Sequence, residues 1–377
     1  MEEARGFAEL QKQGWKPKRT LLYCVWDGEE EGLLGSTEWA EEHDTELRRH
    51  AAMYINSDSN SRGYLGMAGS HSLEKFINGV ARDIEDPEKK MPVWKRDQLA
   101  RISRSPAAER DEVRKRSELR IGALGSGSDY TAFIDHLGIA SLNLGFGGED
   151  GGGIYHSVYD DFYWYTHFSD GDFIYGRALA QTAGTAMMRF ADADLLPYDF
   201  TNFAETVRRY VDEVQKLWKT ESDEIRERNK EIEEGVFSAT ADPRKTSVPP
   251  PVEAQPPFLN FAPLENGVAA LTRGAERYDK AVQKMKLDKP GLEPVNEKLI
   301  LIERGLTLPD GLPGRPWFQN QIYAPGFYTG YGVKTLPGVR EAIEQKHWKE
   351  ADEQIVRVGK VLEKEAALIE EAAAGLE

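Results

Sequence analysis

The feature that most constrains the fold is a change of pattern near residue 195. Before this point, short apolar runs alternate with segments that have helical spacing. The predicted strands are 20–26, 52–55 and 138–144, and the predicted helices are 33–42, 73–83 and 173–190. Strands separated by helices indicate a layered α/β sheet with right-handed crossovers, and apolar runs without alternation are typical of strands buried on both faces of a parallel sheet. We therefore predict an α/β unit over residues 1–195.

The pattern after residue 195 is helical. Apolar residues recur at intervals of three and four in 203–217 and again in 355–369. Both segments are predicted to be amphipathic helices that need a partner surface, which either a second copy of the chain or the first unit can provide. Between them, 243–263 holds seven prolines and is predicted to be an extended connector, because proline fixes φ and lacks an amide donor. We predict an all-α unit over residues 196–377.

The composition excludes several classes of protein. Asp and Glu total 64 against 48 Lys and Arg, a formal net charge of −16, which argues against binding to nucleic acid or to an anionic membrane surface. The single cysteine, Cys24, cannot form a disulfide within the chain. Apolar runs stay shorter than the roughly 18 residues of a membrane span, and the charged start is unlike a signal peptide. The chain as given is therefore expected in the cytoplasm.

Residues with chemical potential follow three predicted strands. The run DGEEEG at 27–32 follows the first strand, Asp58 follows the second, and His156 comes one loop after the third. In open α/β sheets, functional groups gather at the carboxyl ends of the strands, and carboxylates with a histidine are what a hydrolytic zinc site needs. Taken singly, each has a plainer interpretation: solvated loop charge, an Asx-turn at Asp58, or a structural histidine.

The wording of these segments resembles a known family. The segment 26–42, WDGEEEGLLGSTEWAEE, closely resembles the corresponding segment of the glutamate carboxypeptidase II-like zinc peptidases, and so do YINSD at 54–58, LGSGSD at 124–129 and YHSVY at 155–159. In the second unit, GLPGRP at 311–316 and IYAP at 322–325 resemble the dimerisation domain that this family shares with transferrin receptor. The resemblance implies a partial three-layer α/β/α peptidase sheet followed by an all-α dimerisation domain.

The resemblance also implies roles for five residues. Glu29 would be the general base that deprotonates the attacking water and passes the proton to the leaving amine. Glu30, Asp58 and His156 would be zinc ligands, with Glu30 and His156 on one metal and Asp58 on the other. Tyr155 would donate a hydrogen bond to the oxyanion of the tetrahedral intermediate.

A second metal is implied less directly. Glu38 and Glu41 lie at positions i and i+3 of a predicted helix and match two ligands of the family's structural calcium site. An ordinary solvated helix face would show the same two glutamates, so both interpretations stay open.

Substrate selectivity is expected to differ from that of the glutamate-selective members. The two arginines that hold the substrate's terminal residue align with Asn143 and Gly145, the asparagine with Ser128, and the lysine with Gly330 beside a retained Tyr331. A side-chain carboxylate buried without cationic partners is costly. We therefore expect a neutral or apolar residue in place of glutamate.

The chain also departs from the family pattern in its ligand set. In the family, another histidine and a bridging aspartate lie upstream of the residue that aligns with Glu29, and His43, His50 and His71 do not match their contexts. The resemblance therefore implies three of the family's five zinc ligands in this chain. We expect weak zinc binding, poor or no peptide hydrolysis by the chain alone, and a sheet edge left open.

Two functional hypotheses follow from the sequence. The first is a zinc exopeptidase acting on small peptides as a homodimer, with the direction of trimming undetermined and a separate chain as one possible source of the remaining ligands. The second is a non-catalytic, transferrin receptor-like dimerisation module. A lineage that had abandoned catalysis has no reason to keep Glu29, Glu30, Asp58, Tyr155 and His156 together, which favours the first. Intact relatives are usually secreted or membrane-anchored, so the sequence leaves the compartment open.

Overall fold

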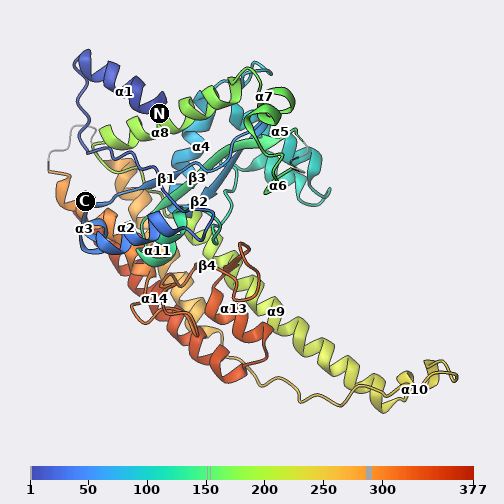
Figure 1. The fold of residues 1–377 in the computed structure, drawn as a ribbon. Coiled ribbons are helices and arrows are strands. Elements are labelled where there is room, and N and C mark those ends of the chain that lie inside the picture. Colours follow the sequence, from blue (N-terminus) through green and yellow to red (C-terminus); the bar gives the residue numbers. More distant parts are fainter. Residues whose placement is uncertain (1, 151, 153, 286–290) are drawn as a thin grey trace.

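The computed structural model describes residues 2–150, 152, 154–285 and 291–377 (Figure 1). A small sheet with its covering helices forms one end of the molecule, and long helices extend from it. In the first half the helices are α1 (Glu2–Lys12), α2 (Leu34–Glu42), α3 (Asp44–His50), α4 (Glu74–Asp83), α5 (Val93–Arg104), α6 (Arg110–Lys115), α7 (Phe162–Phe168) and α8 (Ile174–Asp192). Single turns of other helix types are η1 (His71–Leu73) and the π-helix η2 (Ala132–His136).

The strands of the first half are β1 (Tyr54–Asn56), β2 (Gly63–Gly69) and β3 (Ser141–Gly148), in the spatial order β1-β3-β2. Strand β1 pairs in parallel with β3, whereas β2 pairs with β3 in antiparallel orientation. The predicted all-parallel sheet is therefore mixed. The sequence analysis did not predict β2, because its GYLGMAG sequence has three glycines and an alanine and lacks the β-branched residues that are typical of a strand.

The register of the sheet gives its two faces different chemistry. Ile55 lies opposite Leu142, and Met67 opposite Leu144, on a face that packs into the main hydrophobic core with α4 and α8. Asn56 lies opposite Asn143 on the other face. Over that face a smaller apolar cluster joins residues of α2, α3 and η2. Helices on both sides of a sheet confirm the expected layered α/β architecture.

The prediction of a buried strand at 20–26 is wrong. These residues are extended, but the structure assigns no strand to this stretch, and Leu22 and Val25 are 67% and 91% exposed. Two rings of the segment make contacts: Trp26 lies against Phe133 at a centroid distance of 6.0 Å, and Tyr23 lies against Phe7 of α1 at 6.5 Å. An apolar run shows only that a segment can be buried in a sheet. Burial also requires a neighbouring strand, and none of the described residues forms a strand pair with 20–26.

The second half is built on long helices. They are α9 (Thr201–Glu233), α10 (Val236–Thr240), α11 (Ala262–Lys284), α12 (Glu293–Ile302), α13 (Pro337–Glu344) and α14 (Trp348–Leu376), with one 3-10 turn, η3 (Glu303–Leu306). A two-stranded hairpin, β4 (Tyr323–Pro325) with β5 (Val333–Thr335), corrects the expectation of an all-α unit. Within the described ranges, the helices lack the combination of length and hydropathy that a membrane crossing needs.

The predicted amphipathic stripes are covered within the chain itself. Val207 of α9 and Ile355, Leu362 and Ile369 of α14 are fully buried. Helix α11 approaches α14 so closely that a Cβ atom at Gly267 would lie 2.8 Å from the Cβ of Leu362. The stripe of α14 packs mainly against α11, another helix of the second half, and therefore uses neither of the two surfaces that the sequence left open. The stripes do not by themselves indicate a dimer.

An arm projects from the body (Figure 1). Helix α9 runs well past the predicted segment 203–217, and the chain returns from α10 along the proline-rich stretch, which forms no helix or strand from 241 to 261. This agrees with an extended connector, except that Pro263 lies in the first turn of α11, where a missing amide donor costs nothing. The Asn229 side chain holds the returning segment, since it accepts a hydrogen bond from the amide of Glu253 at 3.0 Å and donates one to its carbonyl at 2.7 Å.

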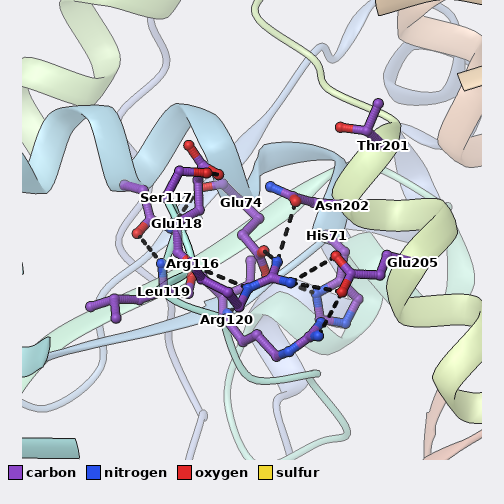
Figure 2. A network of polar contacts seen from close by, with 12 residues as sticks. His71, Glu74, Arg116, Ser117, Glu118, Leu119, Arg120, Thr201, Asn202 and Glu205 are labelled. Carbon is purple, nitrogen blue, oxygen red and sulfur yellow. Dashed lines mark hydrogen bonds and ion pairs between the residues drawn. The ribbon is translucent and has the colours of Figure 1, made fainter. Parts of the chain in front are cut away.

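A polar network joins the two halves (Figure 2). Arg116 donates from Nη1 to both carboxylate oxygens of Glu205, at 2.8 and 2.7 Å, and from Nη2 to Glu74 and Asn202, each at 3.3 Å. Arg120 adds a bond of 2.8 Å to Glu205. We call these five residues the seam network. Because one hydrophobic core also runs from β2 and β3 into α9, α11 and α14, the halves share their interior.

Candidate active site

The acidic run is held as a tight loop on the start of α2. The amide of Gly35 donates to the carbonyl of Asp27 at 2.8 Å, and the amide of Leu33 donates to the carbonyl of Glu29 at 2.8 Å. Gly28 has a φ of 64° and so supplies the left-handed turn. A Cβ at Gly35 would lie 2.5 Å from the Asp27 carbonyl oxygen, which explains why glycine stands there. The backbone thus fixes the loop, while the glutamate side chains extend from it.

Asp58 follows the carboxyl end of β1, and His156 follows the carboxyl end of β3. Because β1 and β3 are parallel, both residues are delivered to one edge of the sheet, as the sequence predicts. His156 has a φ of 58°, a left-handed conformation that is uncommon outside glycine, and its ring stacks on that of Tyr155 at a centroid distance of 3.8 Å. Sparsely populated backbone conformations of this kind concentrate at functional sites.

The imidazole of His156 meets the acidic loop directly. Its Nε2 lies 3.2 Å from Oε2 of Glu30, although the two side chains are 44% and 71% exposed. Two residues 126 positions apart in the sequence are therefore brought into contact, which is the pairing that the resemblance implies for one metal.

Burial and neighbouring charges together shift the pKa of the half-buried Glu29 carboxyl. Partial burial raises the pKa of Glu29 above its ordinary value, and the negative charges of Asp58, Asp129 and Glu30 raise this pKa further, while His156 opposes them. Burial likewise raises the pKa of Tyr155, with Tyr331 and Asp58 acting in the same direction. Charges act strongly only at short range in water, so these effects place Asp58, Asp129 and Tyr331 around the same edge.

Sequence reasoning gave no role to Asp129. The LGSGSD motif signalled it, but only as part of the resemblance. Burial raises the pKa of Asp129, a hydrogen bond from Ser36 lowers it, and the charge of Asp58 raises it. Since one carboxylate oxygen of Asp129 is buried without a partner among the described residues, this side chain belongs with the site residues.

The residues predicted to bind substrate fall into two groups. Ser128 and Asn143 each accept a hydrogen bond of 3.0 Å from the amide nitrogen of Asn56, and Ser128 is only 2% exposed. A Cβ at Gly145 would lie 2.5 Å from the carbonyl oxygen of Ser59, so this position accommodates the backbone that follows Asp58. These three positions therefore contact the end of β1 and the backbone next to Asp58.

Tyr331 is the exception, and it reaches the site from the second half. It is 64% exposed, in the turn between β4 and β5. Its ring leans on the LGSGSD loop, where a Cβ at Gly127 would lie 2.8 Å from it. Gly330, beside it, has a φ of 58° and contributes the turn.

Glu38 and Glu41 are placed on α2, at its exposed face. Glu41 accepts a hydrogen bond of 2.6 Å from the indole nitrogen of Trp317. This geometry agrees with a solvated helix face and gives calcium no support.

The side chains present fit part of a zinc site. A carboxylate and an imidazole in contact are suitable zinc ligands. However, the described residues contain no group of three or more His, Cys, Asp and Glu side chains gathered closely enough to hold a metal ion. The structure therefore brings Glu30 and His156 together and leaves Asp58 as a neighbouring charge.

Comparison with known proteins agrees with both halves. Peptidase family M28 matches residues 1–167, and the transferrin receptor-like dimerisation domain matches residues 259–370. The chain is 30% identical to the probable glutamate carboxypeptidase LAMP1 of Arabidopsis thaliana over 376 residues, which cover 96% of this chain and 47% of the relative. It is 32% identical to a probable glutamate carboxypeptidase of Arthroderma benhamiae over 368 residues (96% and 44%).

The aminopeptidase NAALADL1 of Mus musculus is 26% identical over 390 residues, which cover 98% of this chain and 47% of the relative. The chain thus spans about half the length of the curated relatives that it matches.

Proposed function

This chain belongs to the glutamate carboxypeptidase-like members of peptidase family M28, which carry a transferrin receptor-like dimerisation domain, and from this premise we propose that it acts as a metal-dependent exopeptidase. Peptidases of family M28 are generally zinc-dependent. Because relatives named carboxypeptidase and aminopeptidase both match, the proposal stops at removal of a terminal residue from a small peptide.

One observation carries the proposal: Glu29 stands next to a carboxylate–imidazole pair and has a raised pKa. Burial and three neighbouring carboxylates, those of Asp58, Asp129 and Glu30, hold the pKa of Glu29 above that of an ordinary glutamate. A general base works best when its pKa approaches the operating pH, since it must both accept a proton and give it up.

The roles follow from position. Glu30 and His156 would hold the metal, which when bound supplies an acidified water and polarises the scissile carbonyl. The Glu29 carboxylate takes a proton from the attacking water and later gives it to the leaving amine. The Tyr155 hydroxyl is protonated at neutral pH, as in an ordinary tyrosine, and can donate a hydrogen bond to the oxyanion.

Substrate preference is proposed to be neutral or apolar. The charges that act on Glu29 come from carboxylates and one imidazole, so a second carboxylate on the substrate side chain would be repelled. The exposed ring of Tyr331 instead offers apolar surface at the edge of the site.

The test is hydrolysis of dipeptides by the purified chain with and without added Zn²⁺. We expect slow, zinc-dependent release of amino acid that falls about 10²- to 10⁴-fold in Glu29→Gln, the usual contribution of a general base. Glu31→Gln, in the same loop, is the matched control and should keep the parent rate. Equal rates in Glu29→Gln and the parent, or no zinc-dependent release by the parent, would refute the proposal.

We also propose that the chain forms a homodimer through its second half. The matched dimerisation domain supports this, whereas the apolar stripes of α9 and α14 do not, because they are buried within the chain. The interface should therefore use residues that are exposed in the single chain. Sedimentation equilibrium should give twice the chain mass at micromolar concentration, and a single-chain mass at every concentration would contradict a dimer.

A further inference from the structure

Two exposed surfaces of the chain are chemically complementary. The first lies on the arm, where residues 244–252 have the sequence RKTSVPPPV and form no helix or strand. Val248 and Val252 are 84% and 64% exposed, and no backbone–backbone hydrogen bond between described residues engages 246–252. Because three successive prolines fix φ, this stretch favours an extended polyproline conformation. We call 244–252 the arm segment.

The arm segment is held in place at both ends. At its start, the guanidinium of Arg244 pairs with the carboxylate of Asp242 at 3.0 Å. Directly after its end, the carboxylate of Glu253 pairs with Arg228 at 3.6 Å and with Lys346. An extended segment that is ordered before binding loses little conformational entropy when a partner covers it. The arm segment therefore has the properties of a preformed ligand.

The second surface is a group of aromatic rings on and beside α7. Five rings, which we call the α7 patch, are between 48% and 73% exposed: Tyr159, Phe162, Tyr163, Phe168 and Phe173. Phe162 stacks with Phe173 at a centroid distance of 6.2 Å, and Tyr163 meets Phe168 edge-on at 6.4 Å. Exposed apolar patches mark interaction sites in soluble proteins, and surfaces lined by aromatic rings bind polyproline segments.

The two surfaces lie at opposite ends of one chain. Figure 1 shows α7 beside the sheet and α10 at the far tip of the arm. One chain therefore does not bring the arm segment onto its own α7 patch. Because every copy carries both surfaces, two copies related by a two-fold axis would form the same contact twice.

The charges of the two surfaces are opposite. The whole chain has a formal net charge of −16, so two copies repel each other unless their contact joins local charges of opposite sign. Arg244 and Lys245 are exposed at the start of the arm segment. Asp160, Asp161 and Asp172 are exposed between the aromatic residues of the α7 patch. The charge pattern thus favours a second copy as the partner of the arm segment.

We propose that, in the homodimer, the arm segment of each copy docks on the α7 patch of the other. Its valine and proline side chains cover the aromatic rings, and Arg244 and Lys245 face the aspartates of the patch. This inference rests on the proposed homodimer and names two surfaces that form it. Since Tyr159 follows His156 by three positions, the docked arm segment borders the candidate active site.

Removing apolar side chains from either surface should weaken the dimer. Val248→Ser combined with Val252→Ser, and separately Tyr163→Ala, should each raise the dimer dissociation constant about tenfold or more in sedimentation equilibrium, because a few central contacts contribute most of the affinity of an interface. Val25→Ser and Tyr328→Ala are the matched controls, since both side chains are exposed, at 91% and 81%, and lie outside the two surfaces. Both controls should dimerise as the parent does.

A charge exchange tests whether the two surfaces touch each other. Lys245→Glu or Asp160→Lys alone places like charges on the arm segment and the patch, so each should weaken the dimer. Both changes in one chain restore opposite charges at each contact of a two-fold dimer and should recover most of the lost affinity. Asp160 is chosen because Asp161 caps α7, accepting a hydrogen bond of 2.8 Å from the amide of Trp164. Lys16→Glu, an equal change of net charge outside both surfaces, is the control.

The outcomes separate this inference from the proposals on which it builds. A parent chain that stays a monomer at every concentration would overturn both the homodimer and the docking of the arm segment. A parent dimer that the arm and patch variants leave unchanged, or single charge changes that the double variant does not rescue, would overturn the docking alone. Thermal melts check that each variant keeps its fold. None of these measurements depends on peptide hydrolysis, so the peptidase proposal is tested independently.

Discussion

The seam network and the candidate site use the same kinds of residue in opposite settings. In the seam, Glu74 is fully buried and its charge is met by Arg116. At the site, Glu30 is 71% exposed and its partner is His156, while the charges acting on Glu29 come mainly from other carboxylates. A structural network neutralises its own charge, whereas the site keeps an excess of negative charge. That excess is what a divalent cation would balance.

Breaking the seam should have the largest effect on stability. Arg116→Ala leaves Glu74 buried without its guanidinium and removes the link to Glu205, so we expect a loss of about 3 kcal/mol in the free energy of unfolding. Urea denaturation followed by circular dichroism measures this. Arg114→Ala is the control, because Arg114 is exposed and pairs only with Asp111 among the described residues. A loss below about 1 kcal/mol would mean that the seam resembles a surface ion pair.

Loosening the packing of α11 against α14 should lower the free energy of unfolding by almost as much. Leu362→Ala, at a fully buried position of α14 beside Gly267, is expected to cost about 3 kcal/mol, because the backbones of α11 and α14 are already close and cannot collapse into the cavity. The same denaturation experiment applies. Leu301→Ala, at a partly exposed leucine of α12, should cost much less, and equal costs would show that the close approach does not matter.

A buried carboxyl that forms no salt bridge with any described residue should give a pH-dependent effect of intermediate size. Burial raises the pKa of Glu365 well above its ordinary value, and the neighbouring Glu303 raises this pKa further. The stability contributed by the protonated carboxyl is fully present below the unfolded pKa, near 4.3, and is lost as the pH rises through the folded pKa. Glu365→Gln should therefore stabilise the protein at pH 7 by on the order of 1–3 kcal/mol and hardly at all at pH 4.

Thermal melts of Glu365→Gln at pH 4 and pH 7 test this sign. Glu363→Gln, an exposed glutamate on the same helix, should shift neither melt. A gain of equal size at both pH values would show that shape, and not ionisation, decides the difference.

The smallest effect on stability is expected at the site. Glu29→Gln removes one of several like charges and breaks no buried contact, so the unfolding free energy of the zinc-free protein should stay within about 0.5 kcal/mol of the parent. Scanning calorimetry is sufficient to measure it. A loss above about 1 kcal/mol would make Glu29 a structural residue and remove the contrast between site and seam.

The sequence predicted the helices well where the apolar spacing is long and regular. The segment 355–369 lies inside α14, because its stripe faces a continuous surface whatever that surface is. It failed at 20–26, where the outcome depends on a neighbouring strand, and at β2, where glycines hide the pattern. The local spacing of apolar residues indicates which secondary structure a segment can form. Which other segment it packs against depends on the whole fold.

The same dependence on the whole fold explains which residues of the candidate site could be predicted. Its ligand-type residues stood out because they follow predicted strands, and the structure places Glu30 against His156. Asn56 gave no such signal, since an asparagine in a strand has many uses and its partner Ser128 is 72 positions away. Side-chain pairing over that distance is a property of the folded chain.

Tyr331 has a consequence for how such proteins can change over time. Its ring fills the space that the missing side chain of Gly127 leaves, although the two residues belong to different halves. A chimaera made from the first half of one relative and the second half of another would take these two residues from different parents, and their fit could be lost. Recombination within this family should therefore succeed more often when both residues come from the same parent.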